Sequence, residues 1–312
     1  MWGWAQAARG LFSSRSSSVS EGMHLRRCGL QIAILVVFAW SGLAAAQPAL
    51  QRLGEGLYAY VSDNDASANS SILIGRTGIL VVDTGLNATE GAKLLAAIRQ
   101  VSSLPLKFII NTHYHADHQG GNVVVGPHAV VITTDFTRER TLALMRRPEM
   151  KNFHLRPASV TFAKRLTLHL DPYSVDVYFP GKAHTSGDAL VYFPQQRVIA
   201  TGDLFLNRSC PAMDDGSAEN WVQALNHVLE LPLEHAVPGH FEVGTRADLM
   251  RFRDYLSDLV EQVRAMKQRG DTVDEVRRNL KLEKYRDFRQ FPKFQATFAD
   301  NASVVYQQLQ AH

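Results

Sequence analysis

The sequence predicts a layered α/β fold. Short apolar runs of strand length alternate along the chain with longer stretches of helical periodicity, and this mixture is typical of sheets covered by helices. The chain has 312 residues, of which 46% are hydrophobic and 20% are charged. This composition is sufficient for a sizeable core, and it excludes a disordered, collagen-like or coiled-coil chain.

Apolar runs bounded by polar residues, glycine or proline predict the strands. We expect strands at residues 57–61, 71–75, 79–82, 108–111, 130–133, 166–170, 175–179, 189–193, 198–201 and 236–237. Apolar residues at spacings of three and four predict the helices. We expect helices at residues 88–100, 136–145, 217–230 and 246–268.

The first 46 residues have the pattern of an export signal. Arg26 and Arg27 precede an almost wholly apolar stretch at residues 28–43, and the alanines at 44–46 supply the small residues of a cleavage site. Cleavage before Gln47 would release the protein into the periplasm or outside the cell. The alternative is a retained anchor, but the apolar stretch falls short of the ~20 residues that span a bilayer. No stable membrane insertion is therefore expected after cleavage.

The distribution of charge argues against a polyanionic partner. The formal net charge of the chain is +3, and the four arginines and one glutamate of residues 1–46 account for it, so the remaining chain is neutral. A neutral chain gives no reason to expect nucleic acid or an anionic membrane as a partner. The expected partner is a small-molecule substrate. The sequence leaves open the oligomeric state and the start site, which is Met1 or Met23.

The strongest functional signal follows the strand expected at 108–111. His113, His115, Asp117 and His118 form the pattern H-x-H-x-D-H within six positions. Imidazole and carboxylate are ligands that suit zinc and similar divalent ions. Because residues i and i+2 of an extended chain point the same way, His113 and His115 can bind one ion, and Asp117 and His118 then face a neighbouring position. A surface cluster of histidines is the alternative interpretation.

Four more polar residues stand near the ends of predicted strands, beside glycines. They are Asp83, His184, Asp203 and His240. A rigid sheet can deliver side chains to one edge in this way, because glycine lets the backbone turn tightly. Each residue alone would be explained as a turn residue, but the series predicts a site at one edge of the sheets.

The cysteines exclude two other kinds of structure. Cys28 lies inside the expected signal, so Cys210 is the only cysteine of the mature chain. Neither an intramolecular disulfide nor a thiolate metal cluster is then possible.

The segments that carry these residues resemble, in order, the five motifs of the metallo-β-lactamase-fold hydrolase superfamily. The resemblance covers residues 53–243. It implies an αβ/βα sandwich of two packed β-sheets with outer helices, and two divalent metal ions at one edge, with zinc as the expected metal. By position, the first ion would be bound by His113, His115 and His184 and the second by Asp117, His118 and His240, with Asp203 bridging both.

Two carboxylates have further expected roles. By the resemblance, Asp83 would support the ligand loop without binding an ion. From the chemistry of the ligand set, Asp117 would also orient the nucleophile, and so act as a catalytic residue. Two close cations lower the pKa of the water between them toward ~7, which supplies hydroxide at neutral pH. The expected activity is hydrolysis of a small ester, thioester, lactone or lactam by this metal-bridging hydroxide.

Position 203 separates the possible subgroups. Metallo-β-lactamases of the main subclasses have Cys or Ser where this chain has Asp203, whereas glyoxalase II shares the bridging aspartate. The sequence lacks the glutathione-binding signature of glyoxalase II, and its motifs with the helical tail are similar to exported members near sulfur-oxidation and quinoprotein-relay systems. The alternatives are a metallo-β-lactamase proper, a mononuclear iron oxygenase of sulfur metabolism, and a noncatalytic accessory protein of the same fold.

Three regions are expected along the chain. Residues 1–46 form the leader and signal peptide, residues 47–244 the metallo-β-lactamase-fold domain, and residues 245–312 a C-terminal helical extension. Apolar residues recur in the extension at helical spacing from Leu249 to Met266. This stripe is expected to pack on the sandwich, and a dimer surface is the alternative.

Overall fold

The computed structural model describes residues 50–150 and 154–309, which belong to the unit Pro48–His312. The leader and signal peptide expected over residues 1–46 lie outside the described residues. No helix in the described part of the chain is long and apolar enough to cross a membrane.

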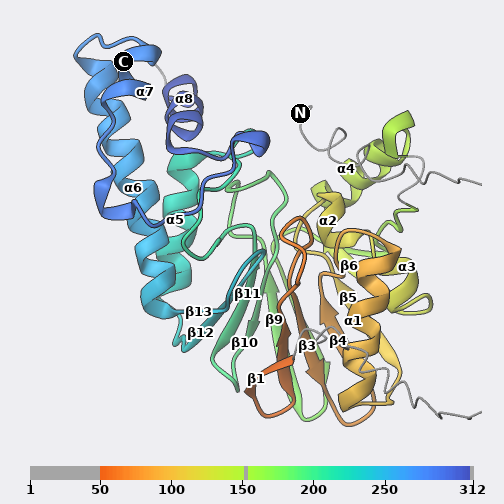
Figure 1. Ribbon diagram of the computed structural model, residues 1–312. Helices are drawn as coiled ribbons and strands as arrows, with labels where there is room; N and C mark the ends of the chain where they lie inside the picture. Colours follow the sequence, from red (N-terminus) through yellow and green to blue (C-terminus); the bar gives the residue numbers. More distant parts are fainter. Residues whose placement is uncertain (1–49, 151–153, 310–312) are drawn as a thin grey trace, which may run out of the picture. The chain divides into compact units, whose positions relative to one another are not determined.

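The strands form two mixed sheets (Figure 1). The first sheet has seven strands in chain order, with β1 to β4 antiparallel to their neighbours and β4 to β7 parallel. These strands are β1 (Leu50–Gly54), β2 (Leu57–Tyr60), β3 (Ser70–Ile74), β4 (Ile79–Val82), β5 (Leu106–Ile110), β6 (Val130–Thr134) and β7 (Val160–Phe162).

The second sheet has six strands in the order β13-β12-β11-β10-β9-β8. They are β8 (Arg165–Leu170), β9 (Tyr173–Tyr178), β10 (Leu190–Phe193), β11 (Val198–Gly202), β12 (His235–Pro238) and β13 (Gly244–Thr245). All pairs are antiparallel except β11 with β12. Because β4 and β5 are also parallel, the carboxyl ends of each parallel pair leave their sheet at the same edge.

The two sheets pack through alternate side chains of their strands. Leu80 of β4 belongs to the core between the sheets together with Val191 of β10. The adjacent residues point outward, Val81 under a helix on the first sheet and Tyr192 under helices on the second. Both faces of these central strands are covered, which explains why their sequences are continuous apolar runs.

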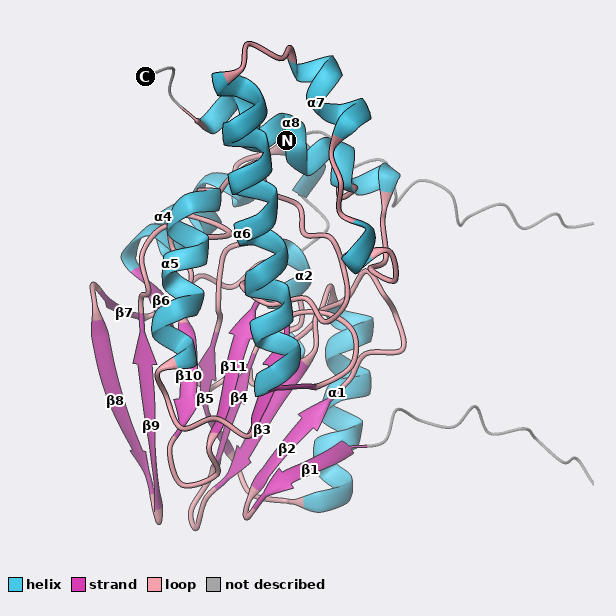
Figure 2. Cartoon of the chain, turned by 90° about the vertical axis from the view of Figure 1, so that its left-hand side faces the viewer, coloured by secondary structure: helices cyan, strands magenta, loops and turns pink. Residues whose placement is uncertain are grey.

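Helices cover the outer faces of both sheets (Figures 1 and 2). Helix α1 (Ala88–Val101) is capped at its N-terminus by the side chain of Asn87 and packs on the first sheet through Leu94 and Ile98. Helices α5 (Ala218–Leu229) and α6 (Arg246–Gln268) cover the second sheet. The shorter helices are α2 (Ala116–Gln119), α3 (Asn122–Val125), α4 (Asp135–Met145), α7 (Val273–Asn279) and α8 (Phe298–Gln308).

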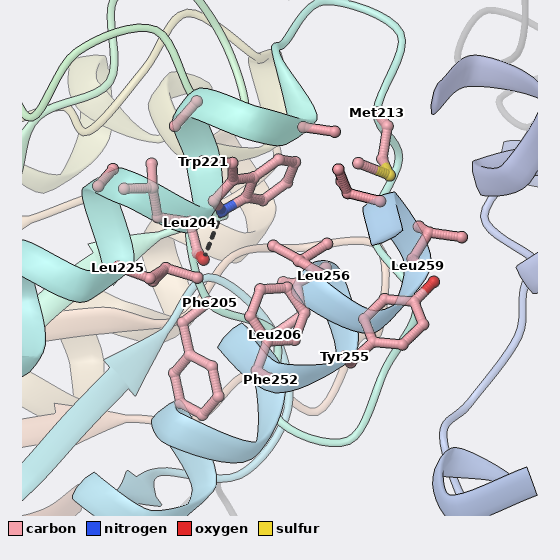
Figure 3. Close-up of a cluster of buried hydrophobic side chains, with 14 of the residues drawn as sticks. Leu204, Phe205, Leu206, Met213, Trp221, Leu225, Phe252, Tyr255, Leu256 and Leu259 are labelled. Atoms are coloured by element: carbon pink, nitrogen blue, oxygen red, sulfur yellow. Dashed lines mark hydrogen bonds between the residues drawn. The ribbon is translucent and has the colours of Figure 1, made fainter. Parts of the chain in front are cut away.

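The C-terminal helices share one core with the second sheet. Figure 3 shows Trp221 and Leu225 of α5 beside Phe252 and Leu256, which belong to the predicted apolar stripe of α6. All four side chains are fully buried. Helices α7 and α8 add further residues to the same core, so the helical extension packs on the sandwich.

The predicted fold class is confirmed: two packed sheets with outer helices and C-terminal helices. Each predicted strand and helix corresponds to an observed element, with bounds that differ by up to two residues. The structure adds β1, β7, β13, α2 and α3, which the sequence analysis did not predict, and it has α7 and α8 within the helical extension expected at residues 245–312. The division at residues 244 and 245 remains a prediction.

Candidate metal centre

The segment after β5 carries four of the predicted ligands. His113 and His115 lie in the loop between β5 and α2, and Asp117 and His118 lie in α2. The sequence analysis expected both in extended chain. His115 has an extended backbone, but His113 lies in a bend, and Nε2 of His113 is 3.0 Å from Nδ1 of His115. The two histidines therefore face a common point through different ring nitrogens.

A first group of possible ligands consists of His113, His115, His184 and Asp203. Nε2 of His184, in the loop between β9 and β10, lies 3.2 Å from Nδ1 of His115. Oδ2 of Asp203, which follows β11, lies 3.6 Å from Nε2 of His184. Three ring nitrogens and one carboxylate oxygen thus converge where the strands end.

A second group consists of Asp117, His118 and His240. Oδ2 of Asp117 lies 3.1 Å from Nε2 of His240 and 3.5 Å from Nε2 of His118. Oδ1 of Asp203 lies 3.2 Å from Nε2 of His118 and 3.6 Å from Nε2 of His240. Asp203 therefore presents one oxygen to each group, as a bridging ligand must.

The donor atoms of both groups fit divalent cations. Tetrahedral bonds of ~2.0–2.1 Å around zinc place neighbouring donor atoms ~3.3 Å apart, and the separations given above are 3.0–3.6 Å. Hydrogen bonds account for only part of the convergence, because Nδ1 of His115 has a single lone pair or a single proton and faces two other ring nitrogens. Nε2 of His118 and Oδ1 of Asp203 are buried and face each other at 3.2 Å, but neither makes a well-aligned hydrogen bond within the described part of the chain. A cation in each group would satisfy them.

Burial keeps two histidines of the first group neutral. It lowers the pKa of His184 to about 4 and the pKa of His113 well below its usual value. Both rings are uncharged at neutral pH, so each has a lone pair to offer to a metal ion.

In the second group, nearby opposite charges outweigh the effect of burial on the pKa values. Burial alone would lower the pKa of His118, but Asp203 and two further carboxylates outweigh it and raise the pKa well above its usual value. Burial alone would raise the pKa of Asp203, but His118 and His240 hold it well below its usual range. The second group therefore retains protons in the absence of a cation, and binding of a cation would release them.

Asp83 lies behind His118 rather than among the donor atoms. Its Oδ2 accepts hydrogen bonds from Nδ1 of His118 at 2.8 Å and from the hydroxyl of Thr112 at 2.7 Å. Its Oδ1 accepts one from the backbone N–H of Thr112 at 2.8 Å. These bonds fix the ring of His118 with Nε2 toward Asp203, which is what a supporting carboxylate does.

Gly202 allows the two ligand-bearing segments to approach each other. Its φ is +50°, and a Cβ at this position would lie 2.4 Å from Oγ1 of Thr112. A side chain would therefore push the end of β11, with Asp203, away from the loop after β5.

The structure adds Asp215, which the sequence analysis did not predict. Asp215 lies between β11 and α5, and its Oδ2 accepts hydrogen bonds from the hydroxyl of Tyr114 and, at 3.4 Å, from Nε2 of His115. The bond from His115 lowers the pKa of Asp215 below its usual range, although burial opposes it. Burial raises the pKa of Tyr114, so its hydroxyl remains a donor. The sequence Asp214-Asp215-Gly216 is typical of a turn and gave no signal of this contact.

Asn69 is the second addition. Its side-chain amide donates to the carbonyl oxygens of Pro238 and Phe241, at 3.1 and 2.7 Å, and its backbone N–H donates to the carbonyl of Gly239 at 2.7 Å. These bonds hold the turn that carries His240. Asn69 stands directly before β3, outside the strand, and its position in the sequence gave no signal of these contacts.

The seven predicted ligands and Asp83 therefore meet at one edge of the sandwich, and their roles remain predictions. The fold and this centre define a metal-dependent hydrolase. The sequence matches the family model described as the metallo-beta-lactamase superfamily over residues 64–240. The chain belongs to this superfamily.

Three similar proteins illustrate the relationship. A metallo-beta-lactamase type 2 of Bacillus cereus is 26% identical over 206 residues, which are 63% of this chain and 76% of that protein. A metallo-beta-lactamase from Pontibacter korlensis superposes with a TM-score of 0.58 at 24% identity, over 67% of this chain and 98% of the other. The stereoselective inverting sec-alkylsulfatase Pisa1 from Pseudomonas sp. superposes with a TM-score of 0.65 at 16% identity, over 84% of this chain.

This chain spans about half the length of the alkylsulfatase, of which 50% is covered. At 24% identity and below, the structural similarities show the shared fold. The membership of the superfamily rests on the family match.

Proposed function

We propose that the protein is an exported hydrolase with two divalent metal ions, acting on a small ester, thioester, lactone or lactam. The observation that carries the proposal is the position of Asp203, whose Oδ1 faces Nε2 of His118 and whose Oδ2 faces Nε2 of His184. A carboxylate placed in this way can hold two cations close together. The donor set of imidazole and carboxylate, without thiolate, supports zinc for both.

The residues of the chain supply positions and charge. His113, His115 and His184 would hold the first ion, and Asp117, His118 and His240 the second. Two such cations activate water at neutral pH and stabilise negative charge on the attacked group. Oδ2 of Asp117 lies beside His240, and we propose that this carboxylate also accepts a hydrogen bond from the attacking water and orients it.

Hydrolysis of β-lactams is a specific candidate within this proposal. The relative from Bacillus cereus is named a metallo-beta-lactamase, which supports testing a lactam. Asp203 is the residue that separates this chain from the main lactamase subclasses, which have Cys or Ser there. An ester or thioester is therefore the first class of substrate to test.

The proposal is tested by metal analysis together with a substrate screen. We expect two zinc ions per chain after reconstitution, and turnover of at least one acyl ester, thioester, lactone or lactam that stops when the metal is removed. His184→Ala should abolish turnover, whereas His169→Ala, at an exposed histidine of β8, should leave it unchanged. A single bound iron ion without hydrolysis would favour the oxygenase instead, and two bound ions without turnover of any substrate would favour the accessory protein.

We also propose export to the periplasm or the cell exterior, from the pattern of residues 1–46. The mature N-terminus should be Gln47. N-terminal sequencing of protein from the periplasmic fraction checks this, and a chain that still begins upstream of Arg26 would contradict it.

A further inference from the structure

A carboxylate and a hydroxyl hold one histidine of the second group from behind. Asp83 accepts hydrogen bonds from Nδ1 of His118 and from the hydroxyl of Thr112. The ring of His118 is thereby fixed, with its other nitrogen toward Asp203 at 3.2 Å. The superfamily resemblance already predicted a supporting role for Asp83.

The same arrangement recurs behind the first group, with different residues. Asp215 accepts hydrogen bonds from Nε2 of His115 and from the hydroxyl of Tyr114. The other nitrogen of His115 faces the first group, 3.0 Å from Nε2 of His113 and 3.2 Å from Nε2 of His184. Each group therefore has one imidazole with one nitrogen at the centre and the other on a carboxylate.

Helix α4 holds the ring of Tyr114 in place. The ring lies edge to face with Phe136, at 6.4 Å between centroids, and the guanidinium of Arg140 lies over it at 5.0 Å. The side chain of Gln119 donates to the carbonyl of Tyr114. Tyr114 is 4% exposed, so its hydroxyl has a fixed position from which to orient Asp215.

Asp215 needs such a partner because it comes from another part of the chain. It lies 100 residues after His115, in the loop between β11 and α5, and its side chain is 24% exposed. A carboxylate on a partly exposed loop has several rotamers open to it. The hydrogen bond from Tyr114 selects one in which Oδ2 faces Nε2 of His115.

We propose that Asp215 and Tyr114 are positioning residues for the first metal ion, and that they act through His115 as Asp83 and Thr112 act through His118. Asp215 fixes the orientation and tautomer of His115, so that Nδ1 is the ligand atom, and its charge makes the imidazole a stronger donor. Tyr114 fixes Asp215. The middle residue of His113-Tyr114-His115 thus has a role of its own. This inference rests on the proposed binding of two ions.

Zinc affinity of the metal-free protein, measured by competition with a chelating dye, tests the proposal. We expect Asp215→Ala to weaken one of the two binding steps by ~10–100-fold, the range found for partners of ligating histidines. Asp215→Asn keeps a hydrogen-bond acceptor but removes the charge, so its zinc affinity should lie between that of Asp215→Ala and that of the parent. Tyr114→Phe should weaken the same step by a smaller factor, because it leaves Asp215 in place.

Asp214→Ala is the matched control. Asp214 is the adjacent, exposed carboxylate, so its loss changes the charge of the loop by the same amount without removing the partner of His115. Its zinc affinity should equal that of the parent. Equal losses of zinc affinity in Asp214→Ala and Asp215→Ala would overturn the proposal. A zinc affinity of Asp215→Ala equal to that of the parent would also overturn it. If Asp215→Ala does not fold, Asp215→Asn and Tyr114→Phe decide in the same way.

The side-chain ¹⁵N and ¹H resonances of His115 in the zinc-loaded protein give a second readout. We expect a metal-bound Nδ1 and an Nε2–H that exchanges slowly in the parent and in Asp214→Ala, and rapidly in Asp215→Ala. A slowly exchanging Nε2–H in Asp215→Ala would overturn the proposal. The metal content of the parent protein tests the proposed function separately. One zinc ion per parent chain would contradict the dinuclear site, and the ratio of the variant's zinc affinity to the parent's would still test the role of Asp215. A parent that binds no zinc overturns both.

Discussion

Gly239 lies against the carboxylate of Asp203 so closely that a Cβ on Gly239 would be 1.9 Å from Oδ1. The backbone N–H of Gly239 also donates to the carbonyl of Gly202, at 2.9 Å. The ends of β11 and β12, which carry Asp203 and His240, are therefore joined without space for a side chain. The position of the proposed bridging ligand depends on a glycine that follows the neighbouring strand.

Gly239→Ala should displace Asp203 and separate the two groups of ligands. We expect the metal content to fall below two ions per chain and hydrolysis to fall by ~10²-fold or more, the scale of losing a key electrostatic element. Elemental analysis and turnover of an ester substrate check this. Gly270→Ala is the control: its Cβ would meet nothing within 4 Å, and at φ +91° it should lower the free energy of unfolding by about 1–2 kcal/mol while metal content and turnover stay parental.

Asp203→Asn should weaken the binding of the second ion before that of the first. The substitution keeps the volume but removes the negative charge that lies beside His118 and His240. We expect hydrolysis to fall by ~10²-fold or more. Asp83→Asn should have a smaller effect, because Asp83 reaches the centre only through His118. Metal content and turnover of both variants are compared with the parent, and an Asp203→Asn protein with two ions and full activity would show that Asp203 is only a turn residue.

The residues that meet at the candidate centre could be predicted from the sequence because their signal is local. The residue types and spacing from His113 to His118 are specific by themselves, and Asp203 and His240 each follow a strand that reads as a buried apolar run. The strands most easily missed lack such a run. The strand β1 has two exposed residues at its centre, and β13 has only two residues, so neither has enough alternation to detect.

Contacts between distant parts of the chain could not be predicted in this way. Asp215 contacts Tyr114 across 101 residues, and Asn69 contacts Phe241 across 172. Neither partner has a pattern that points to the other, since a lone Asp or Asn next to a turn is expected for local reasons. The bend at His113 also differs from the extended chain that strand periodicity suggested, because the loop must direct four side chains into two adjacent groups.

Cys210 should not react in the folded protein. It is 1% exposed in the core shared with the C-terminal helices, and burial raises the pKa of its thiol to about 12. The raised pKa favours the neutral thiol over the reactive thiolate at pH 8. In a Cys28→Ser variant, where Cys210 is the only thiol, we expect no reaction with a chromogenic disulfide reagent at pH 8 until denaturant unfolds the chain. One equivalent of rapid reaction without denaturant would contradict the burial of Cys210.

Trp221 connects the outer helices to the metal centre. Its Nε1 donates to the carbonyl of Leu204 at 2.9 Å, directly after Asp203 in the chain, and its ring lies 5.5 Å from that of His184 (Figure 3 shows the hydrogen bond). Phe252 of α6 lies in the same core, 6.2 Å from Trp221. The two aromatic residues are equally buried. Phe252 packs on the ring of Phe205, at 5.7 Å between centroids, but of the two only Trp221 hydrogen-bonds the residue next to Asp203 and contacts the ring of His184.

Trp221→Phe and Phe252→Leu should therefore distinguish a loss of folding stability from a loss of zinc binding. Each removes buried apolar volume, and Trp221→Phe also leaves a buried carbonyl without its donor, so we expect each to lower the free energy of unfolding by about 1–3 kcal/mol. Only Trp221→Phe should also weaken zinc binding, because only this substitution removes the hydrogen bond to the carbonyl of Leu204, next to Asp203, and the indole that contacts His184. Denaturant unfolding of the metal-free proteins and zinc competition of the folded ones measure the two effects. Equal zinc affinities in both variants would show that Trp221 stabilises the core alone and that the helices do not support the centre.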